Sequence, residues 1–168
     1  NGPAVLKHLL SARAAIRAGE GKLTKTAQTL HGHRLTRKLA EIDTAMALAA
    51  RISVLASLSS ADVAPGDTLE LIVEIEPGLA DTIEIEPVTG PLLHPAAARS
   101  VTEAKTALPL QVRADAPVGN GFAPDWQSLG GNGALSLLVH AGIAGERLTF
   151  AVDTEEPLQV APRHSLQL

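Results

Sequence analysis

The spacing of apolar residues along the chain changes near residue 51. Before this point, apolar side chains recur every three or four positions, which is typical of the buried stripe of an α-helix. After it they alternate with polar side chains, as across residues 68–76, which is typical of β-strands with one buried face. The pattern therefore predicts a helical N-terminal part followed by a β-sheet body.

Residues 1–50 are expected to form an α-helical hairpin. The first helix is predicted over residues 3–18, and the second begins between residues 24 and 35 and runs to about residue 51. Apolar residues of the second helix step by four and three positions, the spacing of a seam that packs against another helix. This helix-packing stripe consists of Leu35, Leu39, Ile42 and Met46. The neighbouring Asp43 is interpreted as a residue of the polar face.

Residues 51–168 are expected to form an immunoglobulin-like antiparallel β-sandwich. Short alternating segments separated by turns that contain proline and glycine are typical of such a sandwich. No helical pattern long enough for a crossover lies between them, which argues against a parallel sheet. Strands are predicted at 52–58, 68–76, 82–86, 107–113, 134–140, 147–153 and 158–161, with a candidate last strand at 165–168. The predicted fold class is therefore mainly β, with the helical hairpin preceding the sandwich.

The composition restricts which functions the chain can have. Its 168 residues include no cysteine, which excludes disulfides, thiolate zinc sites and a cysteine nucleophile. The formal charge of −4 argues against nucleic acid as a partner. No apolar run reaches the roughly 18 residues that a membrane-spanning helix needs. Aromatic residues make up only 2% of the chain, so small aliphatic side chains must supply the core.

Segment 117–133 is the strongest candidate for a ligand or partner loop. It is long, rich in glycine, and carries Phe122, Asp125 and Trp126. Long segments without regular structure inside compact domains are often functional. Phe122 and Trp126 are candidates for a platform on which a sugar ring stacks, which makes carbohydrate a candidate ligand. The alternative is that Trp126 packs beneath its own loop.

No combination of residues predicts a catalytic, cofactor-binding or metal site. His31 and His33 are two candidate metal ligands, but such a site needs more, and they are interpreted as part of a polar linker between the helices. His140 lies in an apolar strand and is expected to be half buried. Five carboxylates alternate with apolar residues and are expected to cover solvent faces of sheets. They are Glu70, Glu74, Glu76, Glu84 and Glu86.

Several short motifs, taken in order, resemble a known family. They are RISVLAS at 51–57, VAPGDT at 63–68, LPLQV at 108–112, DAP at 115–117, DW at 125–126 and EPLQVAP at 156–162. This order, following a helical hairpin, resembles the region downstream of the catalytic domain in large bacterial PIG-L-type (GlcNAc-PI de-N-acetylase-like) deacetylases. The resemblance covers most of the chain.

The resemblance implies an accessory part of a hydrolase. Enzymes of this family are metal-dependent amidohydrolases that remove acetyl groups from N-acetylglucosamine-type substrates, and their zinc signature contains His-Pro-Asp-Asp. Here His94 and Pro95 are followed by Ala96 and Ala97, so the family's metal and base residues have no counterpart in this chain. The implied catalytic domain precedes Asn1 in the same polypeptide. We therefore expect no cofactor and no catalysis by this chain alone.

Two hypotheses for the function follow. The first is a non-catalytic accessory or interaction module of a larger N-deacetylase. Its helical stripe would pack on the sandwich, on the catalytic domain of the same polypeptide, or on a second copy. The alternative is a carbohydrate- or cell-surface-binding sandwich that uses segment 117–133. Proteins of this family are often exported, so the resemblance implies an extracytoplasmic location, and neither hypothesis involves nucleic acid or a membrane span.

Overall fold

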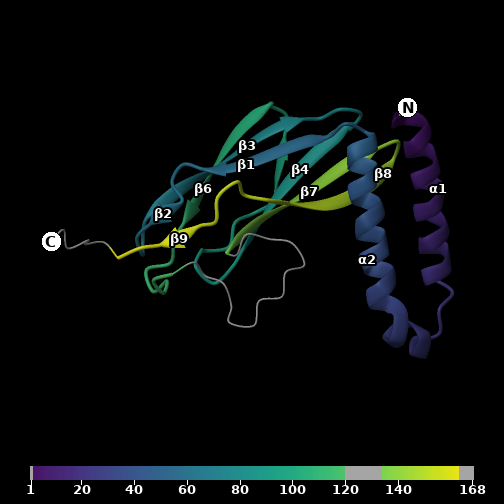
Figure 1. Ribbon diagram of the computed structural model, residues 1–168, viewed down its shortest axis with the longest axis horizontal. Helices are drawn as coiled ribbons and strands as arrows, with labels where there is room; N and C mark the ends of the chain where they lie inside the picture. The colour runs from purple at the N-terminus through teal and green to yellow at the C-terminus, as the bar shows by residue number, and fades with distance from the viewer. Residues whose placement is uncertain (1, 120–133, 163–168) are drawn as a thin grey trace. The chain divides into compact units, whose positions relative to one another are not determined.

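The computed structural model describes residues 2–119 and 134–162, and Figure 1 traces them from two helices into a series of strands. The helices are α1 (Gly2–Glu20) and α2 (Lys25–Ala49). The strands are β1 (Ser53–Leu58), β2 (Asp62–Val63), β3 (Thr68–Glu76), β4 (Thr82–Thr89), β5 (Arg99–Val101), β6 (Lys105–Gln111), β7 (Leu135–Ile143), β8 (Glu146–Asp153) and β9 (Gln159–Val160). The predicted fold class, a helical hairpin followed by an antiparallel β-sandwich, is confirmed.

The two helices are antiparallel neighbours joined by a short turn (Figure 1). Thr24 caps α2, because its hydroxyl accepts a hydrogen bond from the Ala27 N–H at 3.3 Å. The predicted linker at His31 and His33 was therefore wrong, since both residues lie inside α2 and are exposed. The helix continues through Gly32, because one glycine inside a helix costs only about 1 kcal/mol.

The strands form two larger sheets in the described part of the chain. One has the order β1-β3-β6 and the other the order β5-β4-β7-β8, while β2 pairs with β9 in parallel. The register of β3 and β6 is antiparallel, with Leu71 opposite Leu108. In an immunoglobulin constant-type sandwich the fourth strand joins the sheet of the first, second and fifth strands. When the two-residue β2 is left out of the count, the fourth strand of this chain is β5. It pairs with β4 instead, so the strand order is a variant of that architecture.

The core of the sandwich comes from aliphatic side chains that alternate with exposed ones. Strand β3 buries Leu69, Leu71, Val73 and Ile75, and strand β7 buries Leu135, Leu137 and Val139. The predicted solvent-facing carboxylates Glu70, Glu74 and Glu76 are exposed, whereas Glu84 and Glu86 are half buried on the other sheet. His140 is half buried as predicted, and its Nε2 lies 3.1 Å from Oε2 of Glu86.

Contacts within the chain define two compact units. The first comprises Asn1–Ser53, Pro77–Thr82 and Ala141–Phe150, so it joins both helices with the turn after β3 and the turn between β7 and β8. The second comprises Val54–Glu76, Ile83–His140 and Ala151–Leu168. No helix in the described ranges is long and apolar enough to cross a membrane.

The end of α2 is held by the turn that follows β3. The Leu79 N–H donates a hydrogen bond to the Ala50 carbonyl at 2.9 Å, and Arg51 adopts a positive φ of 58°. Gly78 also has a positive φ, and a side chain there would overlap the carbonyl oxygens of Ala50 and Arg51. This close approach of two backbones requires glycine.

Candidate functional site

The predicted helix-packing stripe lies on α2, whose seam with α1 is joined by a hydrogen bond between Arg13 and Asp43. Met46 is completely buried, whereas Leu35, Leu39 and Ile42 are half buried. The stripe is therefore most deeply buried near the end of α2. On α1 the apolar residues with the same helical spacing are Leu6, Leu9, Leu10 and Ile16, of which only Leu6 is buried.

A buried arginine lies in the middle of this seam. Only 2% of the Arg13 side chain is exposed, and its Nε donates to Oδ1 of Asp43 at 2.6 Å. Its Nη1 donates to Oε2 of Glu146, also at 2.6 Å, and its Nη2 donates to the Arg147 carbonyl. One guanidinium thus joins α1 to α2 and to the start of β8. The planar fork of arginine is suited to binding several acceptors in one arrangement.

Asp43 is the second half of this network. Its Oδ2 accepts hydrogen bonds from Nη2 of Arg13 at 3.4 Å and from the Thr149 N–H at 3.0 Å. The interpretation of Asp43 as a polar-face residue was wrong, because only 9% of its side chain is exposed. Asp43 follows Leu39 by four positions and precedes Met46 by three, which places it on the stripe side of the helix.

A tight turn positions the β8 end of the network. Ala144 and Gly145 connect β7 to β8, with φ angles of 50° and 82°. Two consecutive positive φ values at the centre of a two-residue hairpin loop define a type I′ turn. Glu146 and Arg147 follow directly, so the turn geometry sets where their carboxylate and carbonyl groups meet Arg13.

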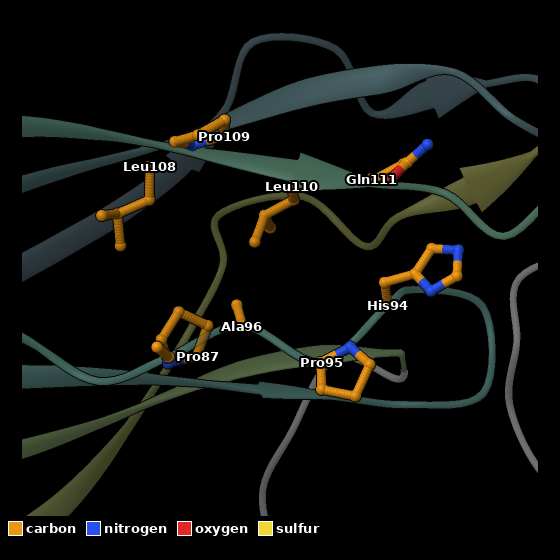
Figure 2. A pocket seen from close by; sticks show the side chains of 9 residues that line it. Pro87, His94, Pro95, Ala96, Leu108, Pro109, Leu110 and Gln111 are labelled. Carbon is orange, nitrogen blue, oxygen red and sulfur yellow. The ribbon is translucent and has the colours of Figure 1, made fainter.

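The second unit contains a groove of about 310 Å³ (Figure 2). Figure 2 shows Leu110 of β6 and Ala96 facing each other across it, with Gln111 and His94 at one end. The His94 N–H donates to the Gln111 carbonyl at 2.9 Å, which joins the two walls. The groove is lined by Pro87, His94, Pro95, Ala96, Ala97, Leu108, Pro109, Leu110 and Gln111. The lining combines three prolines and several aliphatic side chains with polar atoms, and His94 is the one titratable group among these residues.

An ion pair lies just beyond the end of β6. Nε and Nη2 of Arg113 donate to the two carboxylate oxygens of Asp115, each at 2.9 Å. The hydrogen bond from Arg113 lowers the pKa of the Asp115 carboxyl below its ordinary value. Both side chains are exposed, so this pair contributes little to stability.

The predicted ligand loop cannot be placed as a site. Phe122, Asp125 and Trp126 lie outside the described residues. Within the described ranges, no group of three histidine, cysteine, aspartate or glutamate side chains could hold a metal ion.

The chain matches no protein-family model and no curated protein.

The arginine network was not found by sequence reasoning, although part of its signal was present. Arg13 follows Leu10 by three positions and precedes Ile16 by three, so a charge interrupts an apolar stripe. Such an interruption indicates a buried partner, because an unpaired charge is rarely buried. Its partners on β8 could not be identified, since Glu146 is 133 positions away in the sequence.

Proposed function

We propose that this chain is a non-catalytic accessory module of a larger PIG-L-type N-deacetylase, in which the helical hairpin couples the sandwich to the catalytic domain. The observation that carries the proposal is the buried Arg13 network. A coupling element must hold a fixed geometry, and Arg13 binds acceptors from α2 and β8 at once. The motif resemblance supplies the identity of the coupled enzyme.

Buried ion pairs favour one arrangement more than they add stability. The free energy needed to remove two charges from water offsets much of their mutual attraction. An arrangement that separates the two charges leaves each of them buried without a partner, which is strongly unfavourable. Registers of α1 on α2 that separate Arg13 from Asp43 are therefore disfavoured. An all-apolar seam of similar helices would tolerate such shifts more easily.

The hairpin also presents apolar side chains at the end where α1 begins and α2 ends. Leu48 is 73% exposed and Val5 is 50% exposed. Gly2 lies close to the Ala49 carbonyl, which places the two helix termini beside each other. This end of the hairpin is the surface that we assign to the catalytic domain.

The proposal is tested with the reading frame that encodes the chain. We expect this frame to encode a domain with the His-Pro-Asp-Asp signature upstream of Asn1. The separately purified catalytic domain should bind the chain in isothermal titration calorimetry. Leu48→Glu should weaken this binding, whereas Leu55→Glu, at an exposed position of β1, serves as the matched control. Absence of the upstream domain, or release of acetate by the chain alone with zinc, would contradict the proposal.

The second candidate function is carbohydrate or cell-surface binding through segment 117–133. The observation in its favour is that both described ends of this segment are held in place. Gly119 exchanges two backbone hydrogen bonds with Val160, at 2.8 and 2.9 Å, and the Ala134 carbonyl accepts one from Gly90. Binding residues are often carried on loops that a rigid scaffold positions.

Fluorescence titration tests this second candidate directly. Trp126 is the only tryptophan, so any change of indole emission on adding an oligosaccharide reports on this segment. We expect a saturable shift with one member of an oligosaccharide panel and loss of binding in a Trp126→Ala pull-down. A flat titration together with an unchanged Trp126→Ala pull-down would exclude this function.

A further inference from the structure

Positive and negative charge are concentrated in different parts of the chain. Residues 17–38 contain six basic residues and one acidic residue, which gives them a formal charge of +5. Because the whole chain has a charge of −4, the remaining residues carry −9. The basic residues lie in the last turn of α1, in the connecting turn and along α2 as far as its middle, and all are exposed: Arg17, Lys22, Lys25, Arg34, Arg37 and Lys38.

One face of α2 combines two of these basic residues with an apolar one. Leu30, Arg34 and Arg37 are spaced four and three positions apart, so they share a helix face. Leu30 is 60% exposed. Arg37 has only an exposed ion pair with Glu41 at 3.6 Å, and no ion pair within the described ranges involves Arg34. This α2 outer face is thus available to a partner.

Strand β3 carries a complementary row of side chains. Ile72, Glu74 and Glu76 alternate with the buried residues of β3, so they point to the solvent side of the sheet. Glu74 and Glu76 are exposed and Ile72 is half buried. Glu74 forms an exposed ion pair with Lys105 at 2.6 Å, which an approaching arginine can replace. We call these three residues the β3 acidic row.

The spacing of the two surfaces also corresponds. On the helix, Arg34 and Arg37 lie about 6 and 10.5 Å along the axis from Leu30, at 1.5 Å per residue. On the strand, Glu74 and Glu76 lie about 7 and 14 Å from Ile72, at about 3.4 Å per residue. Long arginine side chains can span the remaining difference. Both surfaces thus present an apolar residue followed by two charges, and the charges are opposite in sign.

We propose that the α2 outer face of one copy binds the β3 acidic row of a second copy. A polyanion such as nucleic acid or an anionic membrane would also attract the basic residues. However, the residues outside 17–38, which together carry a charge of −9, would repel it. A second copy offers both opposite charge and an apolar residue at the matching position. The contact uses two different surfaces, so it is heterologous and leads either to closed rings or to open chains.

Sedimentation velocity tests this association. We expect species larger than the monomer at about 100 µM protein in low salt, and monomers in high salt, because exposed charges are screened beyond about 10 Å at 0.1 M ionic strength. The R34E/R37E variant and the E74R/E76R variant should each associate at least about tenfold more weakly, since reversed charges repel across the contact. Lys7→Glu, an exposed reversal elsewhere on the hairpin, should behave like the unmodified chain.

Mixing the two reversed variants provides the decisive experiment. The first variant keeps the native acidic row and the second keeps the native helix face, so the mixture should regain association that neither variant shows alone. Circular dichroism confirms that each variant is folded, as expected for exposed positions. A monomer at every salt concentration, no recovery on mixing, or equal effects of R34E/R37E and Lys7→Glu would overturn the proposal. Sedimentation of the unmodified chain with anionic vesicles but not with itself would overturn it in favour of a membrane surface. Because Leu48 and Val5 are not involved, this result is independent of the proposed coupling to a catalytic domain.

Discussion

Replacing Arg13 with methionine tests how strongly the buried network holds the hairpin. Methionine keeps much of the side-chain volume of arginine and removes its charge and its donors. In the variant, the Asp43 carboxylate stays 9% exposed and keeps only the hydrogen bond from the Thr149 N–H at 3.0 Å. Glu146 loses its partner as well, but at 48% exposure water can solvate it. The cost therefore falls mainly on Asp43.

The expected magnitude follows from the burial of this carboxylate. Removing one partner of a buried ion pair typically destabilises a protein by about 3–5 kcal/mol, because the remaining charge is left buried without compensation. A native domain is stable by only about 5–15 kcal/mol in total. Arg13→Met should thus remove a large share of the stability of the chain. Urea denaturation followed by circular dichroism at 222 nm, where the helices dominate the signal, measures the loss.

A double variant separates the charge effect from the packing effect. In R13M/D43L both charges are replaced by apolar side chains, and such replacements of buried ion pairs are often neutral or stabilising. We expect the double variant to recover to within about 1 kcal/mol of the unmodified chain, with a coupling energy above about 2 kcal/mol. A loss below about 1 kcal/mol in Arg13→Met, or losses that simply add in the double variant, would refute the reasoning.

Three further predictions concern backbone geometry and one exposed carboxylate. Gly78→Ala should lower the free energy of unfolding by about 3 kcal/mol, because the added methyl group overlaps two carbonyl oxygens, whereas Gly66→Ala should cost only about 1–2 kcal/mol of backbone strain. Urea denaturation compares the two. Ala144→Gly should stabilise the turn by about 0.5–1 kcal/mol in thermal unfolding, since it relieves a positive φ of 50°. Arg113→Ala should raise the pKa of the Asp115 carboxyl toward its ordinary value, as measured by carbon NMR titration.

Each of these predictions has its own control. Equal losses at Gly78 and Gly66 would show that strain, rather than overlap, limits the junction. For the turn, Ala151→Gly on β8 should destabilise, because φ is not positive at Ala151. The Asp115 pKa is lowered in the folded chain, so its stabilising effect is present above the unfolded pKa and is lost as the pH falls through the folded value. An unchanged Asp115 pKa in the Arg113→Ala variant would assign the shift to another group.

The sequence predicted those strands whose two faces differ in environment. The predicted bounds of β3 agree with the observed Thr68–Glu76, because nine alternating residues give a clear period of two. Strands β2 and β5 were not predicted, since two and three residues are too few to show any period. The start of α2 was predicted only to lie between residues 24 and 35, because the capping role of Thr24 depends on a single hydroxyl.

The network at Arg13 could be predicted only in part, for a physical reason. Periodicity describes which face of a helix is buried, and it places both Arg13 and Asp43 on that face. It does not state which distant segment covers the face. Glu146 and the Arg147 carbonyl reach Arg13 through the tertiary fold, and no local pattern carries that information.

The same contacts explain why the helices and the β7–β8 turn form one unit. Most of the stability of helices in proteins comes from tertiary packing, and in this hairpin Leu35 and Leu39 are only half buried. We therefore expect the hairpin to depend on contacts outside the two helices. The acceptors that satisfy Arg13 come from Ala141–Phe150, which belongs to the same compact unit as the helices. Arg13 and Asp43 thus form hydrogen bonds with residues more than a hundred positions later in the chain, so we expect a change at the β7–β8 turn to alter the geometry of the hairpin.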